Sequence, residues 1–166
     1  QCTPRGSGAI ELLRISGSEA LKIASKLSLL PKSKRIDAVP THTIHAGHVI
    51  DTNNKPVDYA MFLVMHGPRT FTGEDVVEIT THNNQFIIQE IIETAIAHGA
   101  RLAREGEFCK RAVLNDKIDL IQAEAINELI HANTQMALKQ SLAQVEGSFS
   151  QWITQIEQDL LKAIAF

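Results

Sequence analysis

Hydrophobic and polar residues follow two different rhythms along the chain. In the first two thirds, short apolar or alternating runs predict strands over residues 9–15, 41–50, 57–65, 76–80 and 100–104. The turn-forming residues 51–56 between the second and third runs predict a β-hairpin. This part of the chain is therefore expected to contain a sheet.

Apolar positions spaced by three or four residues predict helices between these strands. One helix is expected from Ser18, as N-cap, to about Leu29. A second is expected from Asn83 or Asn84 to about His98, where Gly99 ends it. Strands and helices in this order predict an α+β fold, with helices packed on a mixed β-sheet, and not a doubly wound one.

The last third of the chain has a helical pattern, and Asp119 is a good N-cap for it. All five prolines lie at or before Pro68, and only Gly147 interrupts the sequence after Gly106. We therefore predict an α/β domain over residues 1–117 and an incomplete helical-bundle segment over 118–166. A coiled-coil-like stripe runs along the second part, and one helix cannot bury its own stripe. Either the chain oligomerises there, or partner helices lie in sequence outside these residues. The stripe comprises Leu138, Leu142, Val145, Phe149, Trp152, Ile156 and Leu160.

Composition excludes several classes of protein. The 166 residues carry a net charge of -3, which argues against a strongly basic nucleic-acid clamp but not against a local basic patch. No apolar run reaches the roughly 18 residues that span a bilayer. Cys2 and Cys109 form neither a metal motif nor a disulfide framework, so reduced thiols in a cytosolic protein are expected. The start, Gln1-Cys-Thr-Pro, has no signal-peptide pattern, and we expect the natural protein to begin a few residues earlier.

Few residues suggest chemistry by themselves. The sequence has no phosphate-binding P-loop motif and no Ser-His-Asp spacing that can be recognised. His42, His45 and His48 lie three apart in a predicted strand, where neighbours point to opposite faces, so a shared metal ion is disfavoured. His82, between a strand and a helix, either lines a pocket or is a structural histidine.

Two charges interrupt apolar strands, Arg14 in one and Glu78 in another. Such charges must find a partner or face solvent. An internal ion pair or an exposed sheet face explains them as well as a binding site does. Lys117, in the turn between two helical patterns, is unremarkable taken alone.

Three runs of sequence resemble one family in the family's own order. They are Thr3 to Gly17, Phe71 to Glu78, and Gly106 to Ala125. The chain resembles the N-terminal part of the tRNA-modification GTPases called MnmE or TrmE. The resemblance implies an aminomethyltransferase-like folate-binding domain that forms a homodimer, followed by the start of a helical domain.

The resemblance also implies site residues. The family's folate-binding residues correspond to Arg14 in Arg14-Ile-Ser-Gly17, Glu78 in Thr72-Gly-Glu-Asp-Val-Val-Glu78, and Lys117 in Leu114-Asn-Asp-Lys-Ile-Asp-Leu120. A carboxylate such as Glu78 can accept the adjacent amino group and ring N–H of the pterin, and cations suit the carboxylates of the folate tail. His82 is a less certain member of this set. No metal ligand is implied.

The activity that the resemblance implies belongs to a longer protein. A tetrahydrofolate, in its 5-formyl or methylene form, supplies a one-carbon unit for carbon-5 of the wobble uridine in tRNA. The flavoprotein MnmG (GidA) takes part, and GTP, with Mg and K, is bound by a GTPase domain that these residues lack. The protein is expected to be cytoplasmic. This fragment is expected to bind folate and dimerise without hydrolysing GTP.

Departures from the family pattern keep alternatives open. The family's His-Gly-Gly is His82-Asn-Asn84 here, and the added bulk could change the pocket. One alternative is a dimerisation scaffold that binds no folate. Another, disfavoured by the uncovered helical stripe, is a free-standing aminomethyltransferase-like enzyme.

Overall fold

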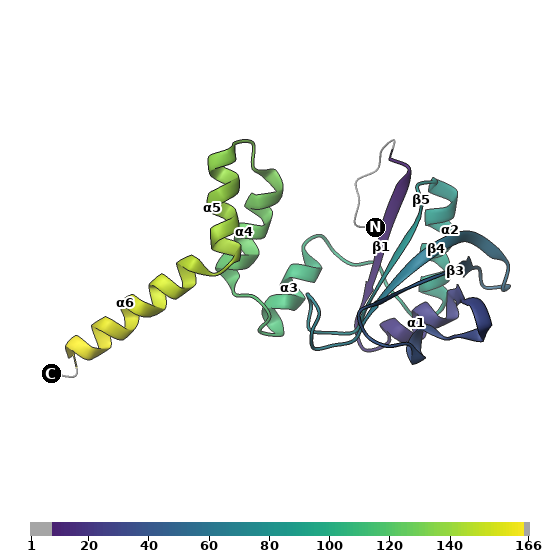
Figure 1. Cartoon of the computed structure of the whole chain (residues 1–166), viewed down its shortest axis with the longest axis horizontal. Coiled ribbons are helices and arrows are strands. Elements are labelled where there is room, and N and C mark those ends of the chain that lie inside the picture. The colour runs from purple at the N-terminus through teal and green to yellow at the C-terminus, as the bar shows by residue number, and fades with distance from the viewer. Residues whose placement is uncertain (1–7, 165–166) are drawn as a thin grey trace. The chain divides into compact units, whose positions relative to one another are not determined.

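A computed structural model describes residues 8–164 and divides the chain into two compact units, residues 1–108 and 109–166 (Figure 1). The first contains the strands and the second most of the helical residues. Helix α3 begins at the end of the first unit. The elements are, in chain order, β1 (Ile10–Ser16), α1 (Ala20–Lys26), β2 (Ser28–Leu29), two short 3-10 turns (Pro31–Ser33 and Ile36–Ala38), β3 (Thr43–Ile50), β4 (Pro56–Met65), β5 (Val76–His82), α2 (Gln85–Ala97), α3 (Glu107–Leu114), α4 (Leu120–His131), α5 (Gln135–Val145) and α6 (Ser148–Ile164).

The first unit is built on one five-stranded sheet with the order β1-β5-β4-β3-β2. All its neighbouring strands are antiparallel. The expected hairpin is confirmed, because β3 and β4 pair along their length and Asp51 accepts hydrogen bonds from the backbone N–H groups of Asn53 and Lys55 in the turn. The α+β fold class is confirmed as well, although the sheet is antiparallel throughout and not mixed.

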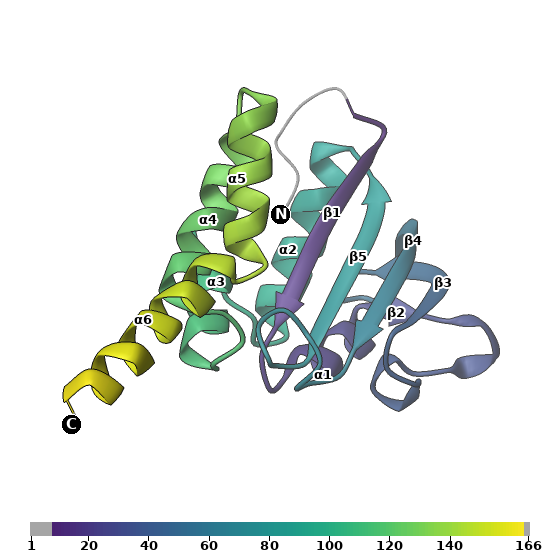
Figure 2. The same cartoon turned by 60° about the vertical axis from the view of Figure 1, so that its left-hand side comes forward.

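Helices α1 and α2 lie on the same face of this sheet (Figure 2). Alternate strand residues point toward them and are fully buried, as period-two geometry requires. Phe62 at 0% exposure is the largest of these side chains. The strand residues of this core are Leu13, Val49, Ala60, Phe62, Val64, Val77 and Ile79.

The second helix was predicted closely and the first was not. Asn84 caps α2, and its side chain accepts from the N–H of Phe86, as expected. Helix α1 ends at Lys26, because Leu27 is buried in the core and the next two residues form β2 against β3. The expected cap is also wrong, since Glu19 holds the N-cap position without a capping bond and pairs with Lys22.

The strand predicted over residues 100–104 does not form. This segment pairs with no strand and most of it is exposed. Its polar groups are used instead to hold Glu107, at the start of α3. Glu107 accepts hydrogen bonds from the side chain of Arg101 and from the backbone of Arg104. These bonds take the place of the strand pairing that the apolar pattern suggested.

In the second unit, α4 and α5 pack against each other and α6 extends from them (Figure 1). Asp119 is the N-cap of α4, as predicted, and it forms a capping box with Gln122. No residue of α6 is buried, and Trp152 is 59% exposed. The part of the apolar stripe that lies on α6 is therefore uncovered within the described residues. No helix described here is both long enough and apolar enough to cross a bilayer.

Candidate functional site

Arg14 and Glu78 face each other on the sheet face opposite to α1 and α2. They are directly opposed across the β1–β5 pair. The Nε and Nη2 atoms of Arg14 lie 2.7 and 2.6 Å from Oε1 of Glu78. Their side chains are 28% and 16% exposed, so the pair lies at the surface of the sheet and is only partly shielded from solvent. The ion-pair explanation for these two strand charges is correct.

Polar groups continue from this pair toward the end of β1. Ser16 lies on the same face as Arg14, because two residues along a strand return to one side. Its hydroxyl donates to Glu74 at 2.8 Å and lies 2.7 Å from the hydroxyl of Thr72. Ser16, Thr72 and Glu74 belong to the sequence runs singled out above, although nothing in their spacing showed that they meet.

The ring of Phe108 covers the guanidinium of Arg14. The Cζ atom of Arg14 lies 5.4 Å from the ring centroid, within cation–π range. Sequence patterns gave no indication of this contact. Phe108 lies in the motif at the start of α3, and 94 positions separate it from Arg14.

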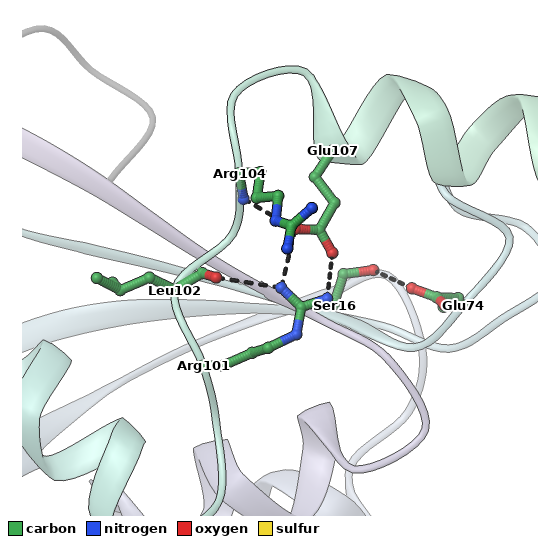
Figure 3. A network of polar contacts seen from close by, with 6 residues as sticks. All are labelled: Ser16, Glu74, Arg101, Leu102, Arg104 and Glu107. Carbon is green, nitrogen blue, oxygen red and sulfur yellow. Dashed lines mark hydrogen bonds and ion pairs between the residues drawn. The ribbon is translucent and has the colours of Figure 1, made fainter.

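The residue before Phe108 is tied down by a network of polar contacts (Figure 3). Glu107 accepts both terminal nitrogens of Arg101, one of them at 2.9 Å, and the backbone N–H of Arg104 at 2.8 Å. Its side chain is only 12% exposed. The position of the start of α3, and with it Phe108, is thereby fixed within the first unit.

His82 lies at the end of β5 and is oriented by Asp58. The carboxylate of Asp58 accepts the backbone N–H of His82 at 2.9 Å and lies 2.8 Å from Nδ1 of its ring. Burial acts to raise the pKa of Asp58, but the hydrogen bonds from His82 and from the N–H of Tyr59 outweigh it and hold that pKa below its usual value. Asp58 is 9% exposed whereas the His82 side chain is 73% exposed, so the ring presents its other nitrogen to solvent.

The side chains of Asn83 and Asn84 each form a hydrogen bond that stabilises the local structure. The Asn83 side chain donates to the carbonyl of Gly8 at 2.8 Å, and Asn84 caps α2. Neither has positive φ, so the backbone here does not need glycine. The first of the family-like runs begins at Thr3, and its first five residues lie outside the described part of the chain.

Lys117 lies in the second unit, in the turn between α3 and α4. Its N–H donates to the carbonyl of Ala112 at 2.9 Å, after Asp116 has taken positive φ. The turn borders an open pocket of about 430 Å³. Its lining residues are Val113, Asp116, Lys117, Ile118, Asp119, Leu120 and Gln122.

The histidines of β3 do not gather. His42 lies before the strand with positive φ, while His45 and His48 point to opposite faces of the sheet. Within residues 8–164 no group of His, Cys, Asp and Glu side chains is arranged to hold a metal ion. Cys109 is a half-buried free thiol in the first turn of α3.

Beside the Arg14–Glu78 pair, the same sheet face exposes a set of large apolar side chains, which we call the open patch. Cross-strand pairing puts Ile44 in the same row as the pair and Met61 in the adjacent row. No lysine, arginine or carboxylate belongs to the patch. Its members and their exposed fractions are Ile10 61%, Leu29 53%, Ile44 64%, Tyr59 54% and Met61 51%.

Comparison with known proteins gives concordant matches over nearly the whole chain. Residues 1–117 match the family described as GTP-binding protein TrmE N-terminus, and residues 120–166 match the MnmE helical domain. A tRNA modification GTPase MnmE from Geobacillus kaustophilus is 46% identical over 164 residues, and one from Bacillus subtilis is 43% identical over the same length. Each alignment covers 98% of this chain and 36% of the relative. A Streptococcus mutans protein of the same name is 45% identical over 163 residues, with 98% of this chain and 35% of the relative covered. The chain thus spans about a third of the length of these relatives.

Proposed function

Because this chain belongs to the TrmE (MnmE) family, we propose that it forms the tetrahydrofolate-binding and dimerising part of a tRNA modification GTPase. The observation that carries the folate proposal is the Arg14–Glu78 pair. A carboxylate that is 16% exposed lies on the sheet face away from α1 and α2, oriented by an arginine. The ligand would be 5-formyl- or methylenetetrahydrofolate.

The donor set suits a pterin. Its amino group and neighbouring ring N–H lie side by side, and a carboxylate accepts such pairs strongly because it is charged. Ser16 adds a half-buried hydroxyl group at the end of the same strand face, held by the buried Thr72. Glu78 is therefore the residue proposed to recognise the ligand head.

Lys117 and His82 are the remaining proposed folate residues. Lys117 carries a flexible cation of the kind that pairs with the tail carboxylates, and it borders the pocket of the second unit. The outward ring nitrogen of His82 would contact the ligand. Since Asp58 can accept from Nδ1, the outward nitrogen of a neutral ring would be a hydrogen-bond acceptor.

We assign dimerisation to the open patch. Five large apolar side chains, each more than half exposed, favour burial against another protein surface. A twofold symmetric dimer places the same patch on both sides. A patch without lysine, arginine or carboxylate can meet its own copy without repulsion between like charges.

The reaction of the whole protein would modify carbon-5 of the wobble uridine of tRNA, together with the flavoprotein MnmG, in the cytoplasm. GTP, with Mg and K, would be bound by a GTPase domain, for which this sequence has no phosphate-binding motif. The domain boundary would lie near residue 117, where one family match ends and the next begins at 120.

One observation favours a scaffold that dimerises without binding folate. Arg14 and Glu78 already neutralise each other, so the site needs no ligand to satisfy its charges. The two functions separate experimentally, because a scaffold would dimerise through the open patch and show no heat of folate binding.

The deciding experiment is calorimetric titration of the 166-residue chain with 5-formyltetrahydrofolate. The parent is expected to bind saturably. Glu78→Gln, which keeps the side-chain shape and removes the charge, is expected to lose at least tenfold in affinity. The matched control is Glu90→Gln, at an exposed position of α2, which should bind like the parent. Equal binding by Glu78→Gln and the parent would refute the site. No binding by a folded, dimeric parent would leave the scaffold.

A further inference from the structure

The polar contacts of Arg14 converge on one oxygen of Glu78. Both Nε and Nη2 reach Oε1, at 2.7 and 2.6 Å. The Nε–H of Arg14 donates a hydrogen bond to Oε1, and the charge of Nη2 lies beside the same oxygen. Among residues 8–164 no side chain or backbone group forms a hydrogen bond with Oε2 of Glu78.

Hydrogen bonds to a single oxygen do not fix a guanidinium by themselves. The group can pivot about Oε1, and the carboxylate would turn with it. The ring of Phe108 supplies the second constraint, since it lies 5.4 Å from Cζ of Arg14. A planar cation held by its edge and by its face has one orientation left.

The position of the Phe108 ring is itself held by contacts of the neighbouring residue. Glu107, the residue before it, accepts from both Arg101 and Arg104 and is largely buried. These contacts close a loop of seven residues that ends next to Phe108 (Figure 3). The ring is therefore held at its position without a ligand.

We propose that Phe108 and Arg14 are positioning residues that orient Glu78, so that Oε2 of Glu78 is the atom offered to the paired donors of the ligand. Arg14 then acts through Glu78, in place of the contact with the folate tail that its charge first suggests. This assignment rests on the proposed folate site. Phe108 is the new member of that site.

The first test is titration with 5-formyltetrahydrofolate of two variants that differ in ring character. Phe108→Leu retains an apolar side chain but has no ring, and it should weaken binding roughly threefold to thirtyfold. Phe108→Tyr keeps a ring and should bind within about twofold of the parent. Both should unfold at the parent's urea midpoint, because the half-buried site accepts either side chain. Equal affinities of Phe108→Leu and the parent would overturn the proposal.

A double-mutant comparison shows whether the ring acts through the arginine. In an Arg14→Met background, Phe108→Leu should cause no further loss, since the ring then has no cation to hold. A loss as large as in the parent background would mean that the ring touches the ligand directly, which also overturns the proposal. Far-UV circular dichroism of each variant verifies that it folds.

A ligand-free measurement separates failure of this inference from failure of the folate proposal. The Arg14 Nε–H should give a protected NMR signal in the parent and in Phe108→Tyr, assigned by its disappearance in Arg14→Lys. In Phe108→Leu the signal should shift and exchange faster. If the parent binds no folate but this pattern holds, the folate site falls and the positioning of Glu78 stands. An unchanged signal in Phe108→Leu overturns the positioning role.

Discussion

Replacing Asp58 by asparagine is expected to destabilise the first unit in a pH-dependent way. The carboxylate accepts two hydrogen bonds from His82, one from its backbone N–H and one from its ring. Asparagine has one neutral acceptor oxygen, which can keep the bond from the backbone N–H, and its NH2 group can bond to the ring only if the ring changes tautomer. Asp58 is 9% exposed, and water can replace the lost partner only poorly.

The magnitude follows from which bond is shielded. A hydrogen bond to a charged group contributes about 1.5–3 kcal/mol and one between neutral groups about 1 kcal/mol, so the shielded backbone bond loses about 1 kcal/mol when the carboxylate becomes an amide. The ring bond involves a side chain that is 73% exposed, so it adds at most about 1 kcal/mol. We expect Asp58→Asn to lower the free energy of unfolding by about 2 kcal/mol near neutral pH.

The sign of the pH dependence is fixed by the direction of the shift. The folded-state pKa of Asp58 lies below its usual value. Its stabilising contribution is therefore complete above the unfolded pKa of about 3.9, and it is lost as pH falls through the folded value. The difference between the parent and Asp58→Asn should be full at about pH 6–7 and should shrink below about pH 4.

Urea unfolding followed by circular dichroism at several pH values measures this difference. Glu90→Gln is the control, because it removes one carboxylate from an exposed position of the same unit and should change stability by less than about 0.5 kcal/mol. The reasoning is refuted if the loss in Asp58→Asn is the same at about pH 3 as at about pH 7. Such a result would mean that the charge of Asp58 is irrelevant.

Three further predictions test other parts of the molecule. A Cβ on residue 47 would lie 2.7 Å from the carbonyl oxygen of Leu29, so Gly47→Ala should separate β2 from β3. The free energy of unfolding should fall by about 1–3 kcal/mol, and hydrogen exchange of the β2 amides should become faster. Asp119→Ala should lower the free energy of unfolding of the helical unit by about 1 kcal/mol through loss of the α4 cap, while Asp119→Asn should retain most of it, both measured by chemical denaturation. Met61→Glu, in the open patch, should convert the proposed dimer to monomers in sedimentation equilibrium, whereas Ile156→Glu on α6 should leave it intact; the opposite pattern would move the interface to the helical stripe.

The sequence was most informative where structure depends on neighbours along the chain. The strands over residues 41–50 and 57–65 and the capping by Asn84 and Asp119 were predictable because period and cap chemistry are local. Strand β2 was missed because two residues carry no period. It forms only since Gly47 leaves room for the neighbouring backbone, which is a property of another strand.

The candidate site depends on contacts between distant parts of the chain. Arg14 and Glu78 are 64 residues apart, and their pairing follows from the β1–β5 register, which no local pattern reveals. Resemblance to a family indicated these two residues, but it gave no hint of Phe108 or Asp58. Phe108 carries no charge, so the signal that drew attention to Arg14 and Glu78 was absent there. Asp58 does carry a charge in an apolar strand, β4, but it lies near the start of that strand beside the turn, where a charge is ordinary.

Side chains along β5 alternate between the core and the opposite sheet face, so adjacent residues serve different purposes: some stabilise the fold and others belong to the proposed site. Ile79 is 0% exposed in the core beneath α1 and α2, whereas Glu78 and Thr80, on either side of it, face the uncovered side of the sheet. Removing the side chain of Ile79 would leave a cavity and cost about 2–5 kcal/mol. Removing the charge of Glu78 creates no cavity, and the arginine left behind is 28% exposed and can be hydrated. Changing Glu78 is therefore expected to lower ligand affinity without lowering stability, whereas changing Ile79 is expected to lower stability. If Glu78 were only part of a structural ion pair, its substitution would not change ligand affinity.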